Sequence, residues 1–112
     1  MSYVPVAKED DVAPGTVRVV EADGKSLALG HCEDGSWGAI DNVCTHDGGV
    51  LGEGVLEDCL VECPRHGARF DLLTGEVKAL PAVFGVNAYP VRVVDGRVEV
   101  DLGVATKELE IG

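Results

Sequence analysis

Two cysteines and two histidines stand in two short segments of this chain of 112 residues. Cys44 and His46 form a Cys-x-His pair, and Cys63 and His66 form a Cys-x-x-His pair after an interval of sixteen residues. Each pair supplies one thiolate and one imidazole, and glycine follows each pair closely. These groups are ligands for zinc and for iron. The four side chains therefore predict a metal site built from two loops.

The composition indicates one small and strongly acidic globular domain. The length suits a single domain, and 15 glycines against one Trp, two Tyr and two Phe indicate short strands and many turns. Nine Lys and Arg against 20 Asp and Glu give a formal net charge of −11. Such a surface repels phosphate backbones and anionic lipid, so we expect neither nucleic acid nor membrane as a partner. A protein with a basic docking patch is the partner that this charge suits.

The cysteines are interpreted through the compartment that the sequence indicates. The first ten residues have neither a basic start nor an apolar run, so no signal peptide is expected. No run of about 18 apolar residues occurs, so no membrane-spanning helix is expected either. We therefore predict a cytoplasmic protein, in which thiols stay reduced. There, four cysteines favour metal ligation over disulfides.

The remaining cysteines and histidine have simple structural interpretations. Cys59 alternates in phase with Val61 and Cys63, as a small side chain on a strand would, and Cys32 ends another predicted strand. A disulfide between Cys32 and Cys59 stays open as an alternative that the reducing compartment disfavours. His31 precedes an acidic turn and is interpreted as a solvated surface histidine.

Short alternating segments between turn residues predict an all-β fold. No amphipathic helix is apparent, and an interval of about ten residues between strands is typical of antiparallel sandwiches and barrels. We expect one domain over residues 1–104, a metal-binding lobe inserted at about 43–77, and a C-terminal tail at 105–112. The predicted strands cover residues 3–7, 16–21, 26–32, 36–43, 55–56, 59–62, 70–73, 76–78, 88–94 and 97–102.

A structural zinc site is the alternative to an iron site. Zinc fingers also combine two cysteines with two histidines, but they place the histidines on a helix with three to five residues between them. This chain has a Cys-x-His spacing instead and no such helix. The spacing therefore disfavours a zinc-stabilised interaction module.

The ligand pattern resembles that of a known family. The pattern Cys-x-His-x16-Cys-x-x-His is similar to that of the Rieske [2Fe–2S] fold, and the segments around it resemble the ferredoxins of aromatic-ring dioxygenase systems. The resemblance extends from residue 3 to residue 102. It implies a Rieske fold with one [2Fe–2S] cluster per chain. It also implies that Cys44 and Cys63 bind the inner iron, and that His46 and His66 bind the outer iron.

Four positions depart from other branches of that family. Rieske proteins of respiratory complexes have a disulfide between the two ligand loops, and Gly49 and Arg65 stand at its positions here. High-potential members place a serine and a tyrosine hydroxyl near the cluster, and Ala68 and Phe70 stand there instead. Without those two hydrogen bonds the reduced state is less stable. We therefore predict a potential of about −150 mV, at the low end of the Rieske range.

The resemblance implies a one-electron carrier rather than an enzyme. It would accept electrons from a reductase, such as a flavoprotein, and pass them to a terminal non-haem iron oxygenase, as a monomer. A Rieske oxygenase also needs an iron bound by two histidines and a carboxylate, and only His31 remains for that purpose. Service to another oxidoreductase, such as a nitrite reductase, or to iron–sulfur assembly is the alternative role.

Overall fold

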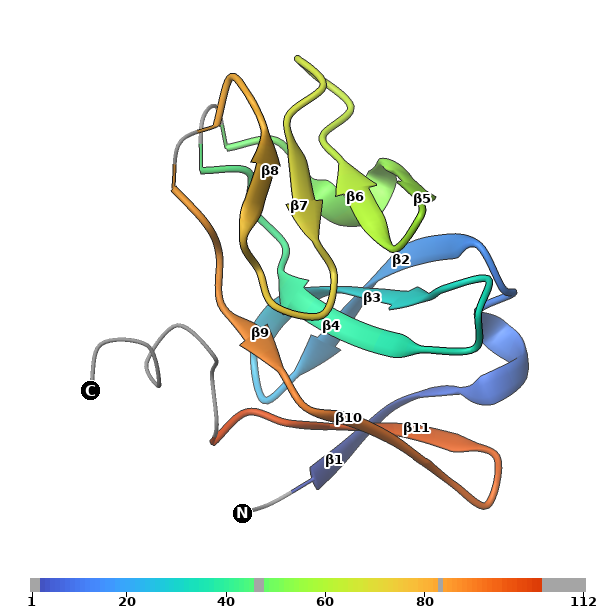
Figure 1. Cartoon of the computed structure of the whole chain (residues 1–112). Coiled ribbons are helices and arrows are strands. Elements are labelled where there is room, and N and C mark those ends of the chain that lie inside the picture. Colours follow the sequence, from blue (N-terminus) through green and yellow to red (C-terminus); the bar gives the residue numbers. More distant parts are fainter. Residues whose placement is uncertain (1–2, 46–47, 83, 104–112) are drawn as a thin grey trace.

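The computed structural model describes residues 3–45, 48–82 and 84–103. Within these residues eleven short strands form three antiparallel sheets, and two 3-10 helices lie between strands (Figure 1). The described residues contain no α-helix. No described helix is long enough or apolar enough to cross a membrane. The prediction of an all-β fold is confirmed. The tail predicted at 105–112 lies outside the described residues.

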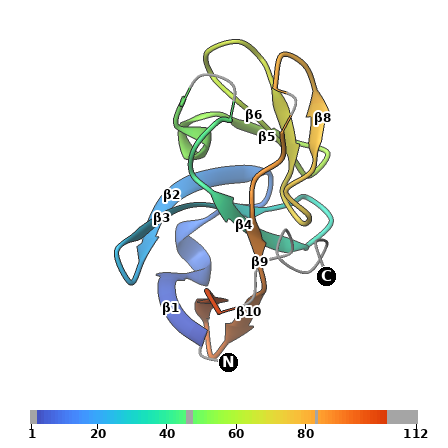
Figure 2. The same ribbon diagram turned by 90° about the vertical axis from the view of Figure 1, so that its left-hand side faces the viewer.

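Two of the sheets pack face to face and form the base of the molecule (Figure 2). Their strands alternate apolar and polar residues, which places one face of each sheet in a common core. The first sheet has the order β2 (Thr16–Ala22), β3 (Lys25–His31), β4 (Trp37–Asp41) and β9 (Ala88–Tyr89). The second has the order β1 (Tyr3–Lys8), β11 (Arg97–Asp101) and β10 (Val91–Val94), and η1 (Glu9–Asp11) follows β1.

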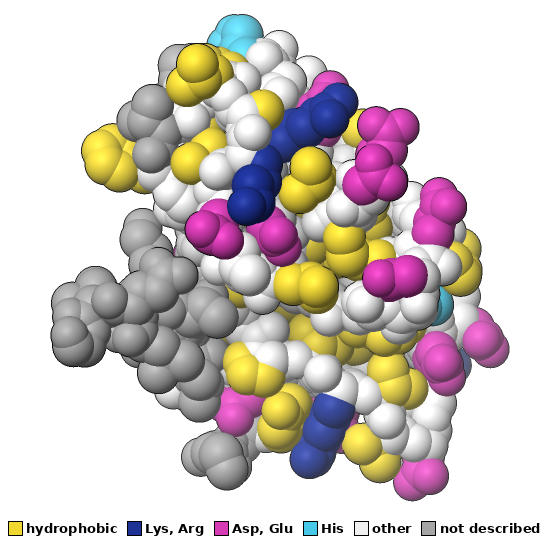
Figure 3. Space-filling view, viewed as in Figure 1, with side chains coloured by type: hydrophobic (Ala, Val, Ile, Leu, Met, Phe, Trp, Pro, Cys, Tyr) yellow, Lys and Arg dark blue, Asp and Glu magenta, His cyan; other side chains and the backbone are white. Residues whose placement is uncertain are grey.

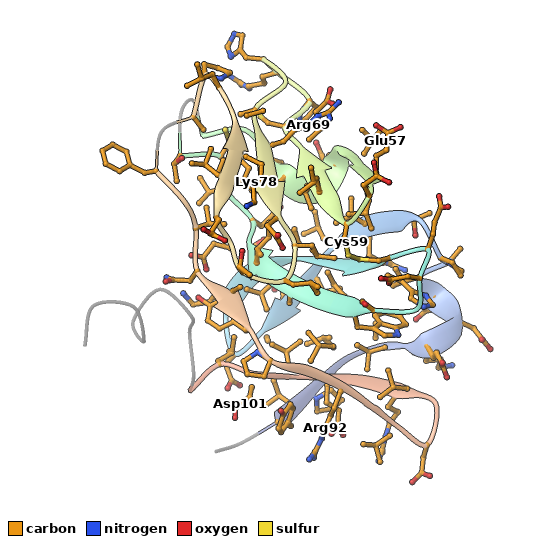
Figure 4. All side chains as sticks on the ribbon, in the orientation of Figure 1. Glu57, Cys59, Arg69, Lys78, Arg92 and Asp101 are labelled. Carbon is orange, nitrogen blue, oxygen red and sulfur yellow. A yellow bond between two sulfur atoms is a disulfide. The ribbon has the colours of Figure 1, made fainter. Side chains whose placement is uncertain are left out.

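The second base sheet joins the two ends of the described chain. Tyr3 of β1 pairs with Asp101 of β11, although the two residues stand near opposite ends of the sequence. Arg92 of β10 binds Glu99 of β11, with 2.7 Å between Nε and Oε1, and its guanidinium lies 4.0 Å from the ring centre of Tyr3 (Figure 4). One side chain therefore links all three strands of this sheet.

The predicted strand 88–94 is divided in two by Pro90. A proline has no N–H group to donate and is excluded from the interior of a sheet. Ala88 pairs with Ile40 in the first base sheet, whereas Val91 pairs with Val100 in the second. The prediction of one continuous strand was wrong because the strand pattern does not show that the chain changes sheets here.

A third sheet forms a lobe above the base (Figures 1 and 2). The chain enters it from β4 and returns from it to β9, which is the neighbour of β4 in the base. The lobe is therefore an insertion between two paired strands. It contains η2 (Leu51–Glu53) and the sheet β5 (Val55–Glu57), β6 (Leu60–Glu62), β7 (Arg69–Asp71) and β8 (Val77–Ala79).

The side chain of Leu72 packs the lobe against the base. Leu72 follows β7, is fully buried, and lies against Gly30 and Gly38, which pair with each other on β3 and β4. A β-carbon at Gly30 or at Gly38 would lie only 2.7 Å from a side-chain carbon of Leu72. The two glycines therefore form a notch into which this side chain fits, and any larger residue at either position would push the lobe away.

A disulfide joins the lobe to the base beside this notch. Cys32 follows β3, and Cys59 lies in the turn between β5 and β6, with 5.2 Å between their Cα atoms. The interpretation of both residues as simple strand side chains was wrong. Cys59 has a φ of 62° and Asp58 a φ of 53°, so these two residues make a left-handed turn and the strand begins only at Leu60.

His31 is half-buried, and its prediction as a solvated histidine was also wrong. Its ring stacks on that of Trp37, with 4.0 Å between the ring centres. Its Nδ1 lies 3.1 Å from the carbonyl oxygen of Val12, which can only accept a hydrogen bond, so Nδ1 is the donor. These contacts give His31 a structural role in the base.

We predict that Leu72→Ala lowers the free energy of unfolding by about 3 kcal/mol, because it leaves a cavity between the lobe and the base. Equilibrium urea unfolding followed by Trp37 fluorescence measures this loss. Leu73→Ala is the matched control, since Leu73 is 45% exposed, and it should cost less than about 1 kcal/mol. Equal losses in the two variants would contradict the role of the notch.

Candidate metal centre

The first candidate ligand loop follows β4 and carries Cys44. Cys44 is 2% exposed. The Cys44 N–H donates to the carbonyl of Gly49 at 2.8 Å, and the Gly48 N–H donates back to the Cys44 carbonyl at 2.8 Å. Gly48 has a φ of 76°, a conformation that costs a glycine little and other residues more. These two hydrogen bonds close the loop around the cysteine.

The second candidate ligand loop lies between β6 and β7 and repeats the same backbone arrangement. The Cys63 N–H donates to the carbonyl of Ala68 at 2.7 Å, and the Gly67 N–H donates back to the Cys63 carbonyl at 3.2 Å. Gly67 has a φ of 79°. In both loops the acceptor lies five residues after the cysteine, and the left-handed glycine lies four residues after it. The two loops therefore share these two closing hydrogen bonds and the position of the left-handed glycine, although their Cys-x-His and Cys-x-x-His spacings differ.

The two cysteines lie in one apolar cluster, and the second loop carries its histidine outward. Cys44 and Cys63 are buried together with Ala68 and Phe70, which are fully buried. His66 is exposed on the loop between β6 and β7, which forms the outer end of the lobe (Figure 1). His46 lies outside the described residues. The structure thus combines two buried thiols with an imidazole at the surface.

Asp41 and Asn42 anchor the start of the first ligand loop. Asp41 accepts hydrogen bonds from the Tyr89 hydroxyl at 2.7 Å and from the Asn87 N–H at 3.1 Å, so it joins β4 to the chain that returns from the lobe. Asn42 donates from Nδ2 to the Ser26 hydroxyl at 2.9 Å and accepts at Oδ1 from the Gly52 N–H at 2.6 Å. Asn42 therefore links the base to η2, at the far end of the same loop.

Gly52 has no room for a side chain. A β-carbon there would lie 2.6 Å from Val19 Cγ2 and 2.9 Å from the Val19 nitrogen of β2. The Asn42 hydrogen bond thus holds a backbone segment that is packed directly on the base. Neither Asn42 nor Gly52 stands out in the sequence, where the only signals are an asparagine shortly before a ligand loop and a glycine after it.

Thr45 ties the first ligand loop to the segment between β8 and β9. Its hydroxyl donates to the carbonyl of Phe84 at 2.5 Å. Leu80 and Phe84 of that segment are 75% and 68% exposed, the highest values among the large apolar side chains of the described residues. Apolar side chains also gather near the outer end of the lobe in the space-filling view (Figure 3). The candidate metal centre is thus bordered by exposed apolar surface.

Charged pairs on the lobe lie across its strands. Arg69 of β7 lies with Nη2 3.1 Å from Glu62 of β6 and 3.9 Å from Glu57 of β5 (Figure 4). These groups are substantially exposed, so each pair contributes little to stability. The two glutamates neutralise the charge of Arg69 on this face of an acidic protein.

The donor set suits an iron–sulfur cluster. Cluster irons take thiolates from cysteine, and in the mixed type one iron takes two imidazoles instead. The buried Cys44 and Cys63 and the exposed His66 offer thiolates inside the lobe and an imidazole toward solvent. Backbone hydrogen bonds close the loop around each cysteine. The described residues therefore fit a cluster with one buried and one accessible side.

Comparison with known families identifies the class of protein. The family model of the Rieske [2Fe–2S] domain matches residues 2–90. This chain therefore belongs to the Rieske [2Fe–2S] family. The cofactor that this family implies is a [2Fe–2S] cluster, in agreement with the donor set described above.

Individual relatives indicate which Rieske proteins this chain resembles. The ferredoxin component of the naphthalene 1,2-dioxygenase system of Pseudomonas putida is 36% identical over 102 residues, which cover 91% of this chain and 97% of that protein. The ferredoxin of carbazole 1,9a-dioxygenase from Nocardioides aromaticivorans IC177 matches with a TM-score of 0.82 and 35% identity, over 89% of this chain and 97% of that one.

A third match is a ferredoxin bound to its oxygenase. It belongs to a solved complex of reduced oxygenase and oxidized ferredoxin in carbazole 1,9a-dioxygenase, with a TM-score of 0.79, 32% identity, and coverage of 88% of this chain and 91% of that one. These three relatives are thus ferredoxins of aromatic-ring dioxygenase systems. The resemblance predicted from the ligand pattern is confirmed.

We predict that Asn42→Ala loosens the first ligand loop. The variant loses both side-chain hydrogen bonds, each of which contributes about 1 kcal/mol, so amide hydrogen exchange at Gly52 should accelerate by roughly 30-fold. Asn42→Asp keeps the oxygen that accepts from Gly52 and should retain most of the protection. Unchanged exchange at Gly52 in the alanine variant would show that packing alone holds the loop.

Proposed function

We propose that this chain is a cytoplasmic one-electron carrier whose single [2Fe–2S] cluster is bound by Cys44, His46, Cys63 and His66. The observation that carries the proposal is the pair of equivalent loops, each with a buried cysteine closed by the same two backbone hydrogen bonds. When bound, the cluster supplies the ability to take up and release one electron at a time.

The arrangement of the ligand residues suits electron transfer to a partner protein. Buried Cys44 and Cys63 would hold the inner side of the cluster away from water. His66, exposed at the outer end of the lobe, would stand between the outer side and a docked partner. Because Leu80 and Phe84 expose apolar surface beside this end, a partner could exclude water there as it docks.

The partners that we propose are a ferredoxin reductase and a terminal oxygenase. The proposal is supported by relatives named as ferredoxin components and by the solved complex of an oxygenase with a ferredoxin. A net charge of −11 favours partners with basic docking patches and a rate of association that falls with salt. We propose a monomer, with the cluster-binding lobe over residues 43–77 of a domain that spans 1–104.

The first test is spectroscopic. The purified holoprotein should contain two irons per chain, and after reduction with dithionite it should give a rhombic EPR signal with a low average g, because imidazoles bind one iron. Cys44→Ser should lose iron and signal together. The double variant Cys32→Ser/Cys59→Ser is the control and should keep both. A colourless protein with one zinc per chain would refute the proposal.

A second test concerns the potential. Ala68 and Phe70 are fully buried beside Cys63 and offer no side-chain hydroxyl, so we expect a potential of about −150 mV. Ala68→Ser adds a donor that stabilises the reduced state and should raise the potential in a redox titration. Ala28→Ser places a hydroxyl in the same core but on base strand β3, and should leave the potential nearly unchanged. A wild-type potential above about +100 mV would contradict this prediction.

A further inference from the structure

The Cys32–Cys59 disulfide borders an open pocket, away from the candidate ligand loops. The pocket has a volume of about 340 Å³ and is lined by Cys32, Glu33, Asp34, Asp58 and Cys59. It stands where the lobe meets the base, and Cys59 marks this junction in Figure 4. A disulfide that borders such a pocket is accessible to a small reagent or to an extended side chain.

The two sulfur-bearing residues differ in their accessibility. Cys32 is 2% exposed, and its N–H and carbonyl are both used within the β3–β4 turn, by Ser36 and Gly35. Cys59 is partly exposed and lies in the left-handed turn with Asp58. Attack on a disulfide proceeds at the sulfur that the incoming thiolate can reach. Cys59 is the more exposed residue of the pair, so its sulfur is the expected point of attack and the sulfur of Cys32 is the leaving group.

Carboxylates line the pocket beside the disulfide. Glu33, Asp34 and Asp58 line the pocket, and a carboxylate oxygen of Asp34 lies within 4.8 Å of both sulfur atoms. The Ser36 backbone N–H donates to Asp34 at 2.8 Å, and this hydrogen bond, together with one from the Ser36 side chain, lowers the pKa of Asp34. The carboxylate is therefore ionised at neutral pH. A thiol that approaches the disulfide must enter a region of negative charge.

We propose that the Cys32–Cys59 disulfide is a thiol-exchange site, attacked at Cys59, whose acidic pocket selects thiols that carry positive charge. The corresponding partner is a thiol or dithiol with an ammonium or guanidinium group close to its sulfur. Anionic thiols are disfavoured by the same carboxylates, so the pocket protects the disulfide from them. This site is separate from the candidate metal centre and does not depend on the electron-carrier role.

The exchange balances with two equivalents of thiol. The first thiolate forms a bond to the Cys59 sulfur, the Cys32–Cys59 bond breaks, and the Cys32 thiolate takes up a proton. The second thiolate attacks the outer sulfur of this mixed disulfide and releases the Cys59 thiolate, which is protonated in turn. The protein disulfide is reduced by two electrons, and two small thiols are oxidised to one disulfide.

Reduction also removes the covalent link between lobe and base. The Cys59 carbonyl still accepts from the Leu72 N–H at 3.0 Å, and Leu72 still fills its notch. The left-handed turn at Asp58 and Cys59, however, loses the cross-link that helps to fix it, and such backbone persists only where the surroundings enforce it. The reduced protein should therefore be cut more readily by proteases at this turn.

The test uses three small thiols of similar size on the holoprotein: cysteamine, 2-mercaptoethanol and 3-mercaptopropionate. Rates of disulfide reduction are followed by alkylation and mass spectrometry, and each is divided by the rate of the same thiol with 2-hydroxyethyl disulfide, so that intrinsic reactivity cancels. We expect the normalised rate of cysteamine to exceed that of 3-mercaptopropionate by about ten-fold or more at low ionic strength. At high salt this ratio should shrink toward one.

Two charge variants form a matched pair. Glu33→Gln/Asp58→Asn removes two carboxylates from the pocket, and Glu21→Gln/Asp23→Asn removes two from the opposite end of the β2–β3 hairpin. Asp58 and Asp23 have φ values of 53° and 50°, a conformation that asparagine also adopts. The pocket variant should lose most of the selectivity among the three thiols. The hairpin variant should keep it.

Peptide mapping of the trapped intermediate locates the attack. We expect the small thiol on Cys59 and the alkylating reagent on Cys32. The proposal is overturned by an adduct on Cys32, by equal normalised rates for the three thiols, or by no reaction with any of them. It is equally overturned if both cysteines of the air-oxidised holoprotein are alkylated without a reductant.

Discussion

The contact on which the rest of the structure depends is that between Leu72 and the paired glycines Gly30 and Gly38. Because neither glycine has a side chain, the turn after β7 packs directly on the backbone of β3 and β4. The lobe is thereby held against the start of β4, and the first candidate ligand loop departs from the other end of this strand. The second loop leads into β7, the strand that ends next to Leu72. β4 and β7 thus connect this packing contact to both loops, and the disulfide beside it adds a covalent constraint.

The two candidate ligand loops are closed by the same backbone hydrogen bonds although their ligand spacings differ. In each, the cysteine N–H and carbonyl are both satisfied within six residues, and a left-handed glycine makes the closure possible. The histidines stand two and three residues after their cysteines in the sequence. Satisfied backbone groups allow the cysteines to be buried without the cost of unpaired N–H groups. The closing hydrogen bonds therefore hold both cysteines in place without regular secondary structure.

Local sequence patterns predicted most of the strands. They did not predict the features that depend on contacts between residues distant in the sequence. Alternation correctly indicated a strand at 97–102, which pairs with β10 across the Asp95-Gly96 turn in a hairpin that needs only neighbouring residues. Pro90 was missed because its effect is to move the chain between sheets. Cys59 was assigned to a strand because its alternation with Val61 continues into the turn, and its partner Cys32 lies 27 residues away in the sequence. The cysteines and histidines of the ligand pattern were recognised because their chemistry is specific, whereas Asn42 acts through geometry that no short motif encodes.

The pairing of β1 with β11 has a consequence for the order in which the molecule is made. Tyr3 is synthesised well before its partner Asp101, which follows only after almost every other described residue. The hairpins β2–β3 and β5–β6 find their partners within a few residues, so the lobe and the first base sheet have all their strands while β1 still has an unpaired edge. Closure of the base therefore follows the synthesis of all the other described strands, and a chain interrupted shortly before residue 97 would carry the whole lobe on an open base.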